Sequence, residues 1–344
     1  MKVDYIIVGQ GLAGSLMAYR LWQHQKTFVV IDAGSTHTSS HIAAGMFTPI
    51  SGKRMVKSWM ADTLYPEMQT TYLELEKLLH ASFLHNCNIQ LSFASVKEQN
   101  DFFAALSDKL IPYVEENIQK NSGLQAPFGA VEIKQSGWLN TQLFLTKFKQ
   151  WLIEQQAFLQ ETFDYAALTN TPTNWTYKHL EANGVIFCEG YQNHNNPWFK
   201  HIPVIENKGD VFVVSTQVLD DKKIYKRGAY AVHLPNGTYK IGSTYKWNNA
   251  NPTPDETGFN ELKLKTDALL NGEYKVLQHL AGIRPTTKDR RPILGKHQTL
   301  NGLYMFNGLG TKGVLLAPYF SKLMFDLAVH HTIPEQEINM SRFE

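Results

Sequence analysis

Residues 5–32 constrain the fold more than any other stretch of this chain. Four apolar residues at 5–8 are followed by the run GQGLAG at 9–14, then by apolar residues at helical spacing up to residue 25, and then by a second apolar run that ends in Asp32. Short apolar runs that contain β-branched residues and end at glycine are typical of strands buried on both faces, as in a parallel sheet. The stretch therefore predicts a strand at 5–8, a helix at 12–25 and a second strand at 28–32.

The three glycines of this run and the acid after it match the fingerprint of a dinucleotide-binding turn. Gly9 allows the chain to leave the strand, Gly11 lets backbone N–H groups approach a pyrophosphate, and Gly14 lets the helix pack closely on the strand. The phosphates would lie at the helix N-terminus, where unpaired N–H groups favour an anion, and Asp32 can accept a hydrogen bond from a ribose hydroxyl. The pattern predicts bound NAD or FAD without separating them, and a position near the N-terminus favours FAD by analogy. A purely structural glycine turn is the alternative.

The composition is that of an ordinary globular protein. With 344 residues, 43% of them hydrophobic and 19% charged, the chain is long enough for two domains. The formal net charge of +2 gives no electrostatic reason to expect nucleic acid or an anionic membrane as a partner. The two cysteines form neither a disulfide framework nor a metal-binding spacing, which indicates a reducing compartment. Because no signal segment and no run of about 18 apolar residues is present, we expect a cytoplasmic protein. Because no metal-binding spacing is present, we expect no bound metal.

The rest of the chain predicts further strands and helices and a separate antiparallel region. Strands rich in β-branched and aromatic residues lie between residues 210 and 246, where Asn236-Gly237 predicts a hairpin turn. An antiparallel sheet within a chain that opens as a parallel one indicates an inserted second domain. The remaining predictions are helices at 55–80, 97–110, 257–270 and 317–330, strands at 88–96, 130–133 and 184–190, and a helix ending near residue 156 whose N-cap is Asn140 or Thr141.

Several further segments carry candidate ligand contacts. The segment 33–49 is rich in small residues that would let the backbone lie against a flat ligand, and a Ser-rich loop is the plainer interpretation. Lys53 and Arg54 can meet a phosphate or a carboxylate, or can lie on the surface. The glycine-rich turn at 307–313 precedes a helix and can aim N–H groups at an electron-rich ring. Cys188 is interpreted as a small buried apolar residue rather than a nucleophile, because no histidine or helix N-terminus is evident beside it.

Four of these segments carry a family signature. The most specific is AGIRPTTKDRRPILG at 281–295, and the others are NGLGTKGV at 307–314, AAGM at 43–46 and the strand at 184–190. Together they resemble the D-amino-acid oxidase family of FAD-dependent oxidoreductases, in particular its glycine oxidase and sarcosine oxidase branch. The resemblance implies an α/β fold in which a Rossmann-like FAD-binding domain of the GR2 type, with a parallel sheet, carries an inserted α+β substrate domain on a mostly antiparallel sheet. It implies FAD-binding segments at 1–80, 137–205 and 276–344 and substrate-binding segments at 81–136 and 206–275.

The resemblance assigns Arg284 to a clamp on the substrate carboxylate. A planar guanidinium binds a carboxylate through two parallel hydrogen bonds and stays charged at any working pH, while an ordinary salt bridge is the alternative. Tyr230 stands at a position similar to that of a family active-site tyrosine, although tyrosine is also a normal strand residue, and Tyr245 is a further candidate for substrate contact. The implied FAD contacts are Gly9, Gly11, Leu12, Ala13, Gly14, Asp32, Ala33, Ala44, Gly45, Met46, Cys188, Gly190, Arg284, Gly308, Gly310, Thr311, Lys312 and Gly313.

The chain departs from the family pattern at two places. Gly308 is followed by Leu309 where the family commonly has histidine, so we expect a polar contact near the flavin to be missing. Cys188-Glu189 replaces the usual pair of small residues before Gly190, which puts an acid near the cofactor. The chain shows no match to the cysteine that attaches flavin covalently in some sarcosine oxidases, so we expect noncovalent FAD.

The function implied by the resemblance is oxidation of the C–N bond of a small amino acid or N-methyl amino acid. Arg284 would hold the carboxylate while a hydride passes to flavin N5 and leaves an imine, a route that needs no side-chain base. Three alternatives remain open: a flavin enzyme acting on a carboxymethylaminomethyl group of tRNA, a non-catalytic flavin-binding redox protein, and an NAD-dependent dehydrogenase. The exact substrate, its stereochemistry, the electron acceptor and the oligomeric state are not determined by these patterns.

Overall fold

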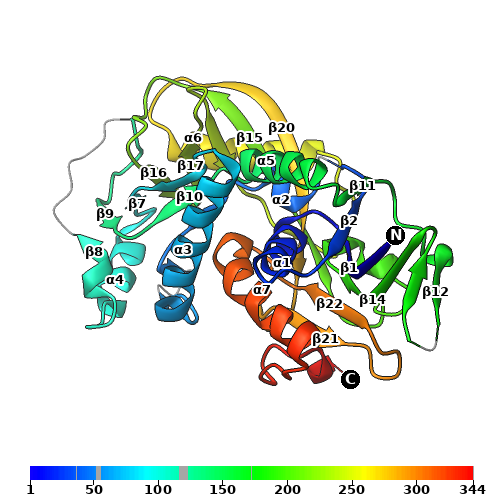
Figure 1. Cartoon of the computed structure of the whole chain (residues 1–344). Helices are drawn as coiled ribbons and strands as arrows, with labels where there is room; N and C mark the ends of the chain where they lie inside the picture. The colour runs from blue at the N-terminus through cyan, green and yellow to red at the C-terminus, as the bar shows by residue number, and fades with distance from the viewer. Residues whose placement is uncertain (36, 52–55, 116–122, 172, 344) are drawn as a thin grey trace.

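The computed structural model describes residues 1–35, 37–51, 56–115, 123–171 and 173–343. Two large sheets dominate the molecule, and helices pack against both of them (Figure 1). One sheet is parallel at its centre and the other is almost entirely antiparallel. The fold class expected from the sequence is therefore confirmed.

The first sheet contains the two strands that open the chain. Its central strands run in the order β11-β2-β1-β14-β22, and each neighbouring pair is parallel. Tyr5 and Ile7 of β1 pack into one hydrophobic core and Ile6 and Val8 into another, as a strand buried on both faces requires. Its members are β1 (Lys2–Val8), β2 (Phe28–Asp32), β11 (Phe158–Gln160), β14 (Leu180–Phe187) and β22 (Leu303–Asn307), with β12 (Leu168–Asn170), β13 (Trp175–Tyr177) and β21 (Ile293–Lys296) joined in antiparallel pairs.

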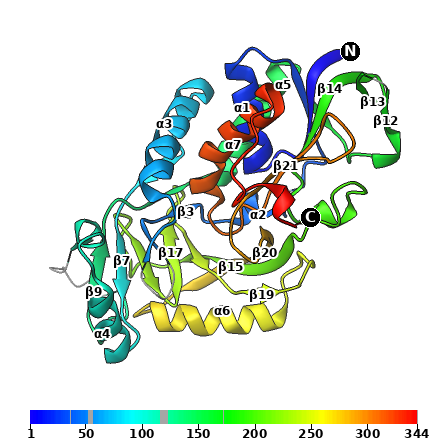
Figure 2. The same ribbon diagram turned by 90° about the horizontal axis from the view of Figure 1, so that it is seen from below.

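Helices from distant parts of the chain share one core with this sheet. Asn140 caps the helix that follows it by accepting a hydrogen bond from the Leu143 N–H, so one of the two predicted N-caps is confirmed. The first and last long helices lie side by side (Figures 1 and 2). The helices of this core are α1 (Leu12–Gln23), α3 (Ala61–Leu79), α5 (Thr141–Glu154) and α7 (Gly313–His330).

The second sheet runs in the order β19-β15-β18-β17-β16-β7-β9-β8, with β20 also paired to β15. Only the β16–β7 pair is parallel among the described strands of this sheet. Helix α6 (Glu256–Leu269) lies along the outer face of the sheet (Figure 2). The strands are β7 (Ile89–Ser92), β8 (Val114–Glu115), β9 (Ala130–Ile133), β15 (Ile205–Ser215), β16 (Ile224–Arg227), β17 (Ala229–His233), β18 (Tyr239–Gly242), β19 (Lys246–Trp247) and β20 (Lys275–Thr286).

Short elements complete the described chain. They comprise a three-stranded sheet of β3 (Met46–Phe47), β10 (Gly137–Leu139) and β6 (Leu84–Asn86), the pair β4 (Ile50–Ser51) and β5 (Val56–Lys57), the helices α2 (Ser39–Ile42) and α4 (Val96–Ala105), and the 3₁₀ turns Ile111–Tyr113, Tyr165–Ala167, Gly190–Asn195 and Met340–Phe343. Among the described helices, none combines the length and the apolar character needed to cross a bilayer.

The predicted elements agree with the structure except at several ends. The hairpin at Asn236-Gly237 is confirmed, because β17 and β18 pair antiparallel around it. The helix predicted at 55–80 begins only at Ala61, because Met60 adopts a left-handed conformation at φ +52° and residues 56–57 form β5. The strand predicted at 88–96 ends at Ser92, and the next helix starts at Val96 because the Ser95 side chain caps it. The helix predicted at 97–110 ends at Ala105, and the one predicted at 317–330 begins four residues earlier.

The predicted domain division can be placed on these sheets but stays a prediction. Strand β15 begins at residue 205, next to one predicted boundary, and β20 begins at residue 275, next to another. Residues 276–286, predicted to belong to the FAD-binding part, pair with β15 in the second sheet.

Candidate active site

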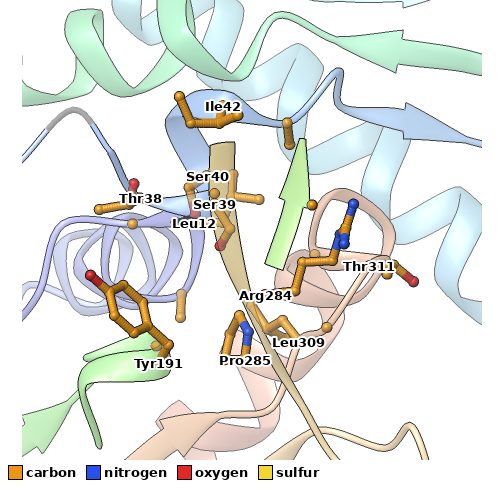
Figure 3. Close-up of a pocket in the computed structure, with 18 of the residues that line it drawn as sticks. Leu12, Thr38, Ser39, Ser40, Ile42, Tyr191, Arg284, Pro285, Leu309 and Thr311 are labelled. Atoms are coloured by element: carbon orange, nitrogen blue, oxygen red, sulfur yellow. Dashed lines mark hydrogen bonds between the residues drawn. The ribbon is translucent and has the colours of Figure 1, made fainter. Parts of the chain in front are cut away.

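A cavity of about 590 Å³ lies where the first sheet meets the second. One side, the glycine-rich wall, consists of residues 9, 11–13, 32–33, 188–190 and 310–313. A second group of lining residues, the second-sheet wall, consists of Gly209, Val211, Lys226, residues 228–230, 242–243 and 245, and Arg284. In the close-up, Arg284 and Thr311 lie on one side of the cavity, and Leu12, Thr38 and Tyr191 lie on the other (Figure 3).

The first glycine turn is built from backbone that comes too close for side chains. Gly9 has φ +100°, and a Cβ there would lie 2.6 Å from the Cys188 carbonyl oxygen. A Cβ on Gly14 would lie 1.8 Å from the Gly9 carbonyl oxygen, so this glycine allows the close packing of helix on strand that the sequence predicts. Gly11 is the N-cap residue of α1, and the first residues of that helix line the cavity. The N-terminus of this helix therefore borders the cavity, where its backbone N–H groups favour an anion.

Asp32 lines the cavity beside the first glycine turn. Its two carboxylate oxygens accept hydrogen bonds from the backbone N–H groups of Gln10 (2.7 Å) and Gly34 (2.6 Å). These bonds hold the carboxylate at the carboxyl end of β2. Each oxygen has further lone-pair capacity, which a ribose hydroxyl can use.

A second glycine turn lies between the carboxyl end of β22 and the start of α7. Gly308 and Gly310 adopt φ +73° and +55°, and the Gly310 N–H donates to the Pro285 carbonyl (2.9 Å), which links this turn to the end of β20. The Asn307 side chain donates to the Gly190 carbonyl (2.8 Å) and so joins the carboxyl ends of β22 and β14. Gly308 itself lies outside the cavity wall, as does Gly14, and both shape the turns behind it.

The acid that departs from the family pattern is held by hydrogen bonds. Glu189 accepts a hydrogen bond from the Tyr165 hydroxyl (2.5 Å) and another from the Asn196 side chain (2.7 Å). Burial raises the pKa of Glu189 to about 7 even though both bonds favour the carboxylate. Cys188 is buried, and burial raises the pKa of its thiol, which fits an inert residue.

Lys312 brings a cation to the start of α7. Its Nζ donates to the Ser58 hydroxyl at 3.3 Å. Burial, with repulsion from Arg290 and Arg291, lowers the pKa of Lys312 to about 8. An amine with this pKa can change its charge near physiological pH.

Arg284 is the centre of the second-sheet wall. One guanidinium nitrogen donates to the Asn207 side-chain oxygen (2.8 Å) and to the Thr244 carbonyl (3.3 Å), and the other donates to the Ser243 hydroxyl (2.7 Å). No acid pairs with this guanidinium among the described residues. A Cβ on Gly209 would lie 2.1 Å from Arg284 Nη2, so the guanidinium occupies the place of the missing side chain.

The two candidate tyrosines stand on either side of this arginine. The guanidinium carbon lies 4.6 Å from the centre of the Tyr245 ring, which is 53% exposed. The Tyr230 ring lies across Gly242, where an added Cβ would be 2.9 Å from the phenol oxygen. Burial raises the pKa of Tyr230 to about 12, although the Arg284 cation opposes the shift. The phenol is therefore protonated at neutral pH and can donate a hydrogen bond.

Most residues predicted from the sequence to contact ligand line this one cavity. They include Arg284, Tyr230, Tyr245, Asp32, Ala33, Ala44, Gly45, Met46, Cys188, Gly190, Thr311, Lys312 and Gly313 together with Gly9, Gly11, Leu12, Ala13 and Gly310. Lys53 and Arg54 lie outside the described residues.

The sequence interpretation missed the residues that hold Arg284. Asn207, Ser243 and Thr244 come from different strands or strand ends, and no local motif marks them. It also missed the role of segment 38–40, whose Ser40 hydroxyl accepts a hydrogen bond from the Leu12 N–H (3.3 Å). The run of small polar residues in that segment was the available signal.

Comparison with known proteins agrees with this geometry. The family model described as DAO: FAD dependent oxidoreductase matches residues 4–327. In an alignment 375 positions long, the chain is 29% identical to glycine oxidase of Bacillus subtilis (strain 168). This alignment covers 100% of this chain and 98% of that protein. It is 23% identical over 308 residues to the tRNA 5-methylaminomethyl-2-thiouridine biosynthesis bifunctional protein MnmC of Legionella pneumophila (strain Corby), with 84% of this chain and 45% of that protein covered. The crystal structure of glycine oxidase from Geobacillus kaustophilus has the same fold, with a TM-score of 0.79 at 18% identity and coverage of 100% and 98%.

The nucleotide fingerprint and the partly buried Arg284 guanidinium line one cavity, and the family match assigns this combination to a flavin-dependent enzyme. The chain belongs to the DAO family of FAD-dependent oxidoreductases. FAD rather than NAD is therefore the cofactor, and the alternatives of an NAD-dependent dehydrogenase and of a non-catalytic flavoprotein are overturned.

Proposed function

We propose that this enzyme oxidises the C–N bond of a small amino acid or N-methyl amino acid. The observation that carries the proposal is the Arg284 guanidinium, which lines the same cavity as the glycine-rich wall and has no acidic partner among the described residues. A partly buried guanidinium without an acidic partner is suited to bind a carboxylate through charge-assisted hydrogen bonds. The full-length similarity to a protein named glycine oxidase supports a small amino acid as the substrate.

The glycine-rich wall has the features that noncovalent FAD requires. Gly9, Gly11 and the N-terminus of α1 leave backbone N–H groups open to a pyrophosphate, and Asp32 is placed for a ribose hydroxyl. The second turn, at residues 307–313, would lie against the flavin. We propose these roles for the cavity-lining residues predicted from the sequence, together with the predicted division into FAD-binding and substrate-binding segments and the predicted cytoplasmic location.

The chemistry that FAD supplies when bound is acceptance of a hydride at N5, taken from Cα or from an N-methyl carbon. Arg284 would fix the carboxylate and so set which C–H bond points toward the glycine-rich wall. The Tyr230 phenol, protonated because its pKa is raised to about 12, would donate a hydrogen bond and would not act as a base. Loss of the hydride would convert the neutral amine to an iminium ion, which gives the imine when it releases a proton to solvent. Water would then hydrolyse this product to a carbonyl compound and ammonia or, from an N-methyl amino acid, an amine.

The test is the absorption spectrum of the FAD-loaded enzyme under anaerobic conditions, before and after addition of glycine, sarcosine, D-alanine or D-proline. We expect loss of the oxidised flavin bands with at least one of these. Arg284→Ala should then need about 100-fold more substrate for the same rate of bleaching, since a charge-assisted contact is lost. Flavin bands that none of the four amino acids bleaches would contradict the proposal.

A second function has one observation in its favour, the similarity to MnmC. The chain spans less than half the length of that relative, and the net charge of +2 offers little general attraction for RNA. A tRNA-linked oxidation would show as tRNA binding that weakens steeply with salt, and as flavin bleaching by tRNA that carries a carboxymethylaminomethyl group.

A further inference from the structure

The second-sheet wall carries a second cation, Lys226. It lies on β16 and pairs in register with Tyr230 on β17. Side chains alternate along this strand: Ile224 packs in the core on the cavity side of the sheet, and Tyr225 packs in the core beneath α6. Lys226 therefore points to the cavity side, and it lines the cavity.

Lys226 has no polar partner among the residues that the structure describes. The neighbouring Lys223 pairs with Glu132 at 2.5 Å, and the buried Lys208 of the same sheet pairs with Asp255 at 2.7 Å. The acid that acts electrostatically on Lys226 is Glu98, which is exposed on α4 and forms no ion pair with it. Burial lowers the pKa of Lys226, and Glu98 opposes this shift.

The acids and cations that line the cavity are distributed unequally. Among the described lining residues, the acids are Asp32, Glu161 and Glu189, which lie at or just after the carboxyl ends of strands of the first sheet, while the glycine-rich wall also carries the cation Lys312. The second-sheet wall contributes two cations, Arg284 and Lys226, and no acid among its described residues. Electrostatic complementarity therefore favours a ligand with two negative groups on this side.

The register of the strands gives the order of these cations. Lys226 pairs with Tyr230, and Tyr230 pairs with Gly242 on β18. The next residue, Ser243, accepts a hydrogen bond from Arg284. Two strand spacings separate Lys226 from Gly242, which is about 10 Å between Cα atoms. Along the sheet, Tyr230 thus lies between the strand that carries Lys226 and the strand end that contacts Arg284.

We propose that Lys226 binds a second anionic group of the substrate, so that the enzyme favours an amino acid that carries a second carboxylate, or an anion like it, over a singly charged one. The inference rests on the proposed function, because Arg284 supplies the contact to the first carboxylate. The long side chain of lysine can reach along the wall past Tyr230 to meet the second group.

The test compares ligands that differ by one charge. Succinate, glutarate and adipate are each compared with their own monomethyl ester, and the dissociation constant from the FAD-loaded protein is measured by perturbation of the flavin spectrum. We expect at least one diacid to bind about tenfold more tightly than its ester, as a hydrogen bond between charged groups implies. The chain length with the largest preference measures the separation of the two cations.

The variants locate the effect. Lys226→Met should remove the preference for the diacid, and Lys226→Arg should keep most of it. Lys222→Met is the matched control, because it removes one exposed lysine four residues away and should leave the preference intact. If Lys226→Met loses FAD, Lys226→Gln takes its place. Equal affinity for diacid and ester in the unmodified enzyme would overturn the inference, as would a preference that survives Lys226→Met.

Failure of this inference can be told from failure of the proposed function. Bleaching by glycine or sarcosine without any diacid preference would overturn the role of Lys226 and leave amino acid oxidation standing. A diacid preference that depends on Lys226, in a protein that no amino acid bleaches, would support the second anion site and overturn the proposed oxidation.

Discussion

The two walls of the cavity are made in different ways. The glycine-rich wall is mostly backbone, and its shape depends on missing side chains: a Cβ at residue 9 or 14 would collide with a carbonyl oxygen. The second-sheet wall is made of side chains from separate strands, with Arg284 and Lys226 as its cations. The two walls should therefore be sensitive to different kinds of substitution. Adding atoms should damage the first wall, and changing charge should alter the second.

The largest effect is expected for Gly14→Ala. The new Cβ would lie 1.8 Å from the Gly9 carbonyl oxygen, so the helix must move away from the strand. Such overpacking costs about 1–3 kcal/mol. We expect the purified protein to lose most of its FAD, measured as the ratio of flavin to protein absorbance.

Gly11→Ala provides the graded comparison for this change. A Cβ at residue 11 would meet only the Ser40 hydroxyl, at 3.2 Å, and that side chain can rotate. Its loss of folding stability, measured as the fall in melting temperature, should be smaller than that of Gly14→Ala. A Gly14→Ala protein that keeps a full complement of FAD would show that the glycine-rich wall is not limited by backbone packing.

Arg284→Ala should act on ligand affinity more than on FAD content. Removing the guanidinium should raise the dissociation constant of simple carboxylates about 100-fold. Arg284→Lys should recover part of this loss, because the charge returns without the two parallel hydrogen bonds. Titration of the flavin spectrum with acetate measures both variants, and an unchanged dissociation constant in Arg284→Ala would remove this residue from the carboxylate site.

A smaller effect is expected from Asp210, which lies behind the second-sheet wall. This fully buried carboxylate accepts hydrogen bonds from the Thr244 hydroxyl (2.7 Å) and interacts with the His279 ring (3.0 Å). The Thr244 carbonyl in turn accepts from Arg284. Asp210→Asn should loosen this support and raise KM about fivefold, equal to ~1 kcal/mol, with little change in kcat.

Asp255→Asn is the matched control for Asp210. It removes a carboxylate that pairs with Lys208 (2.7 Å) and Lys246 (2.6 Å) in the same part of the molecule, away from the cavity wall. This variant should lower the melting temperature without a rise in KM. If both variants change KM alike, the effect of Asp210 is a general loss of stability rather than positioning of Arg284.

A pH-dependent effect on stability is expected at the contact between β18 and residues 42–43. The Lys240 amine donates to the carbonyls of Ile42 (3.1 Å) and Ala43 (3.2 Å), and burial lowers its pKa to about 8. Above pH 8 the folded state therefore binds fewer protons at this site than the unfolded state, so the free energy of unfolding should rise with pH up to the ordinary lysine pKa. Between pH 7.5 and 9.5 the melting temperature of the parent should rise relative to that of Lys240→Met, by an amount equivalent to about 1–2 kcal/mol. A constant difference would contradict the lowered pKa.

The sequence predicts the first glycine turn of the glycine-rich wall well because that turn is local. Residues 5–32 contain strand, turn, helix and acid in one continuous stretch, and each of these forms as the apolar spacing indicates. The hairpin at Asn236-Gly237 is similarly local. Interactions between near neighbours decide such elements, so pattern alone is sufficient.

The second-sheet wall is harder to predict because it is assembled from distant strands. Arg284 could be marked by its family motif, but its partners Asn207 and Ser243 lie 77 and 41 residues away. The direction of Lys226 depends on which face of β16 meets the cavity, and this is known only when the sheet is formed. The start of α3 depends on the left-handed backbone of Met60, which helical spacing does not encode.

The absence of a side chain at residue 209 determines where the Arg284 guanidinium can lie. The guanidinium fills the volume that a Cβ at Gly209 would take. Gly209→Ala should therefore displace the guanidinium without any change to Arg284 itself. A designer who wants this scaffold to accept amines without a carboxylate can therefore begin on the neighbouring strand. The effects of substitutions at positions 209 and 284 should therefore depend on each other. A library that varies both positions together should give pocket shapes that single substitutions do not.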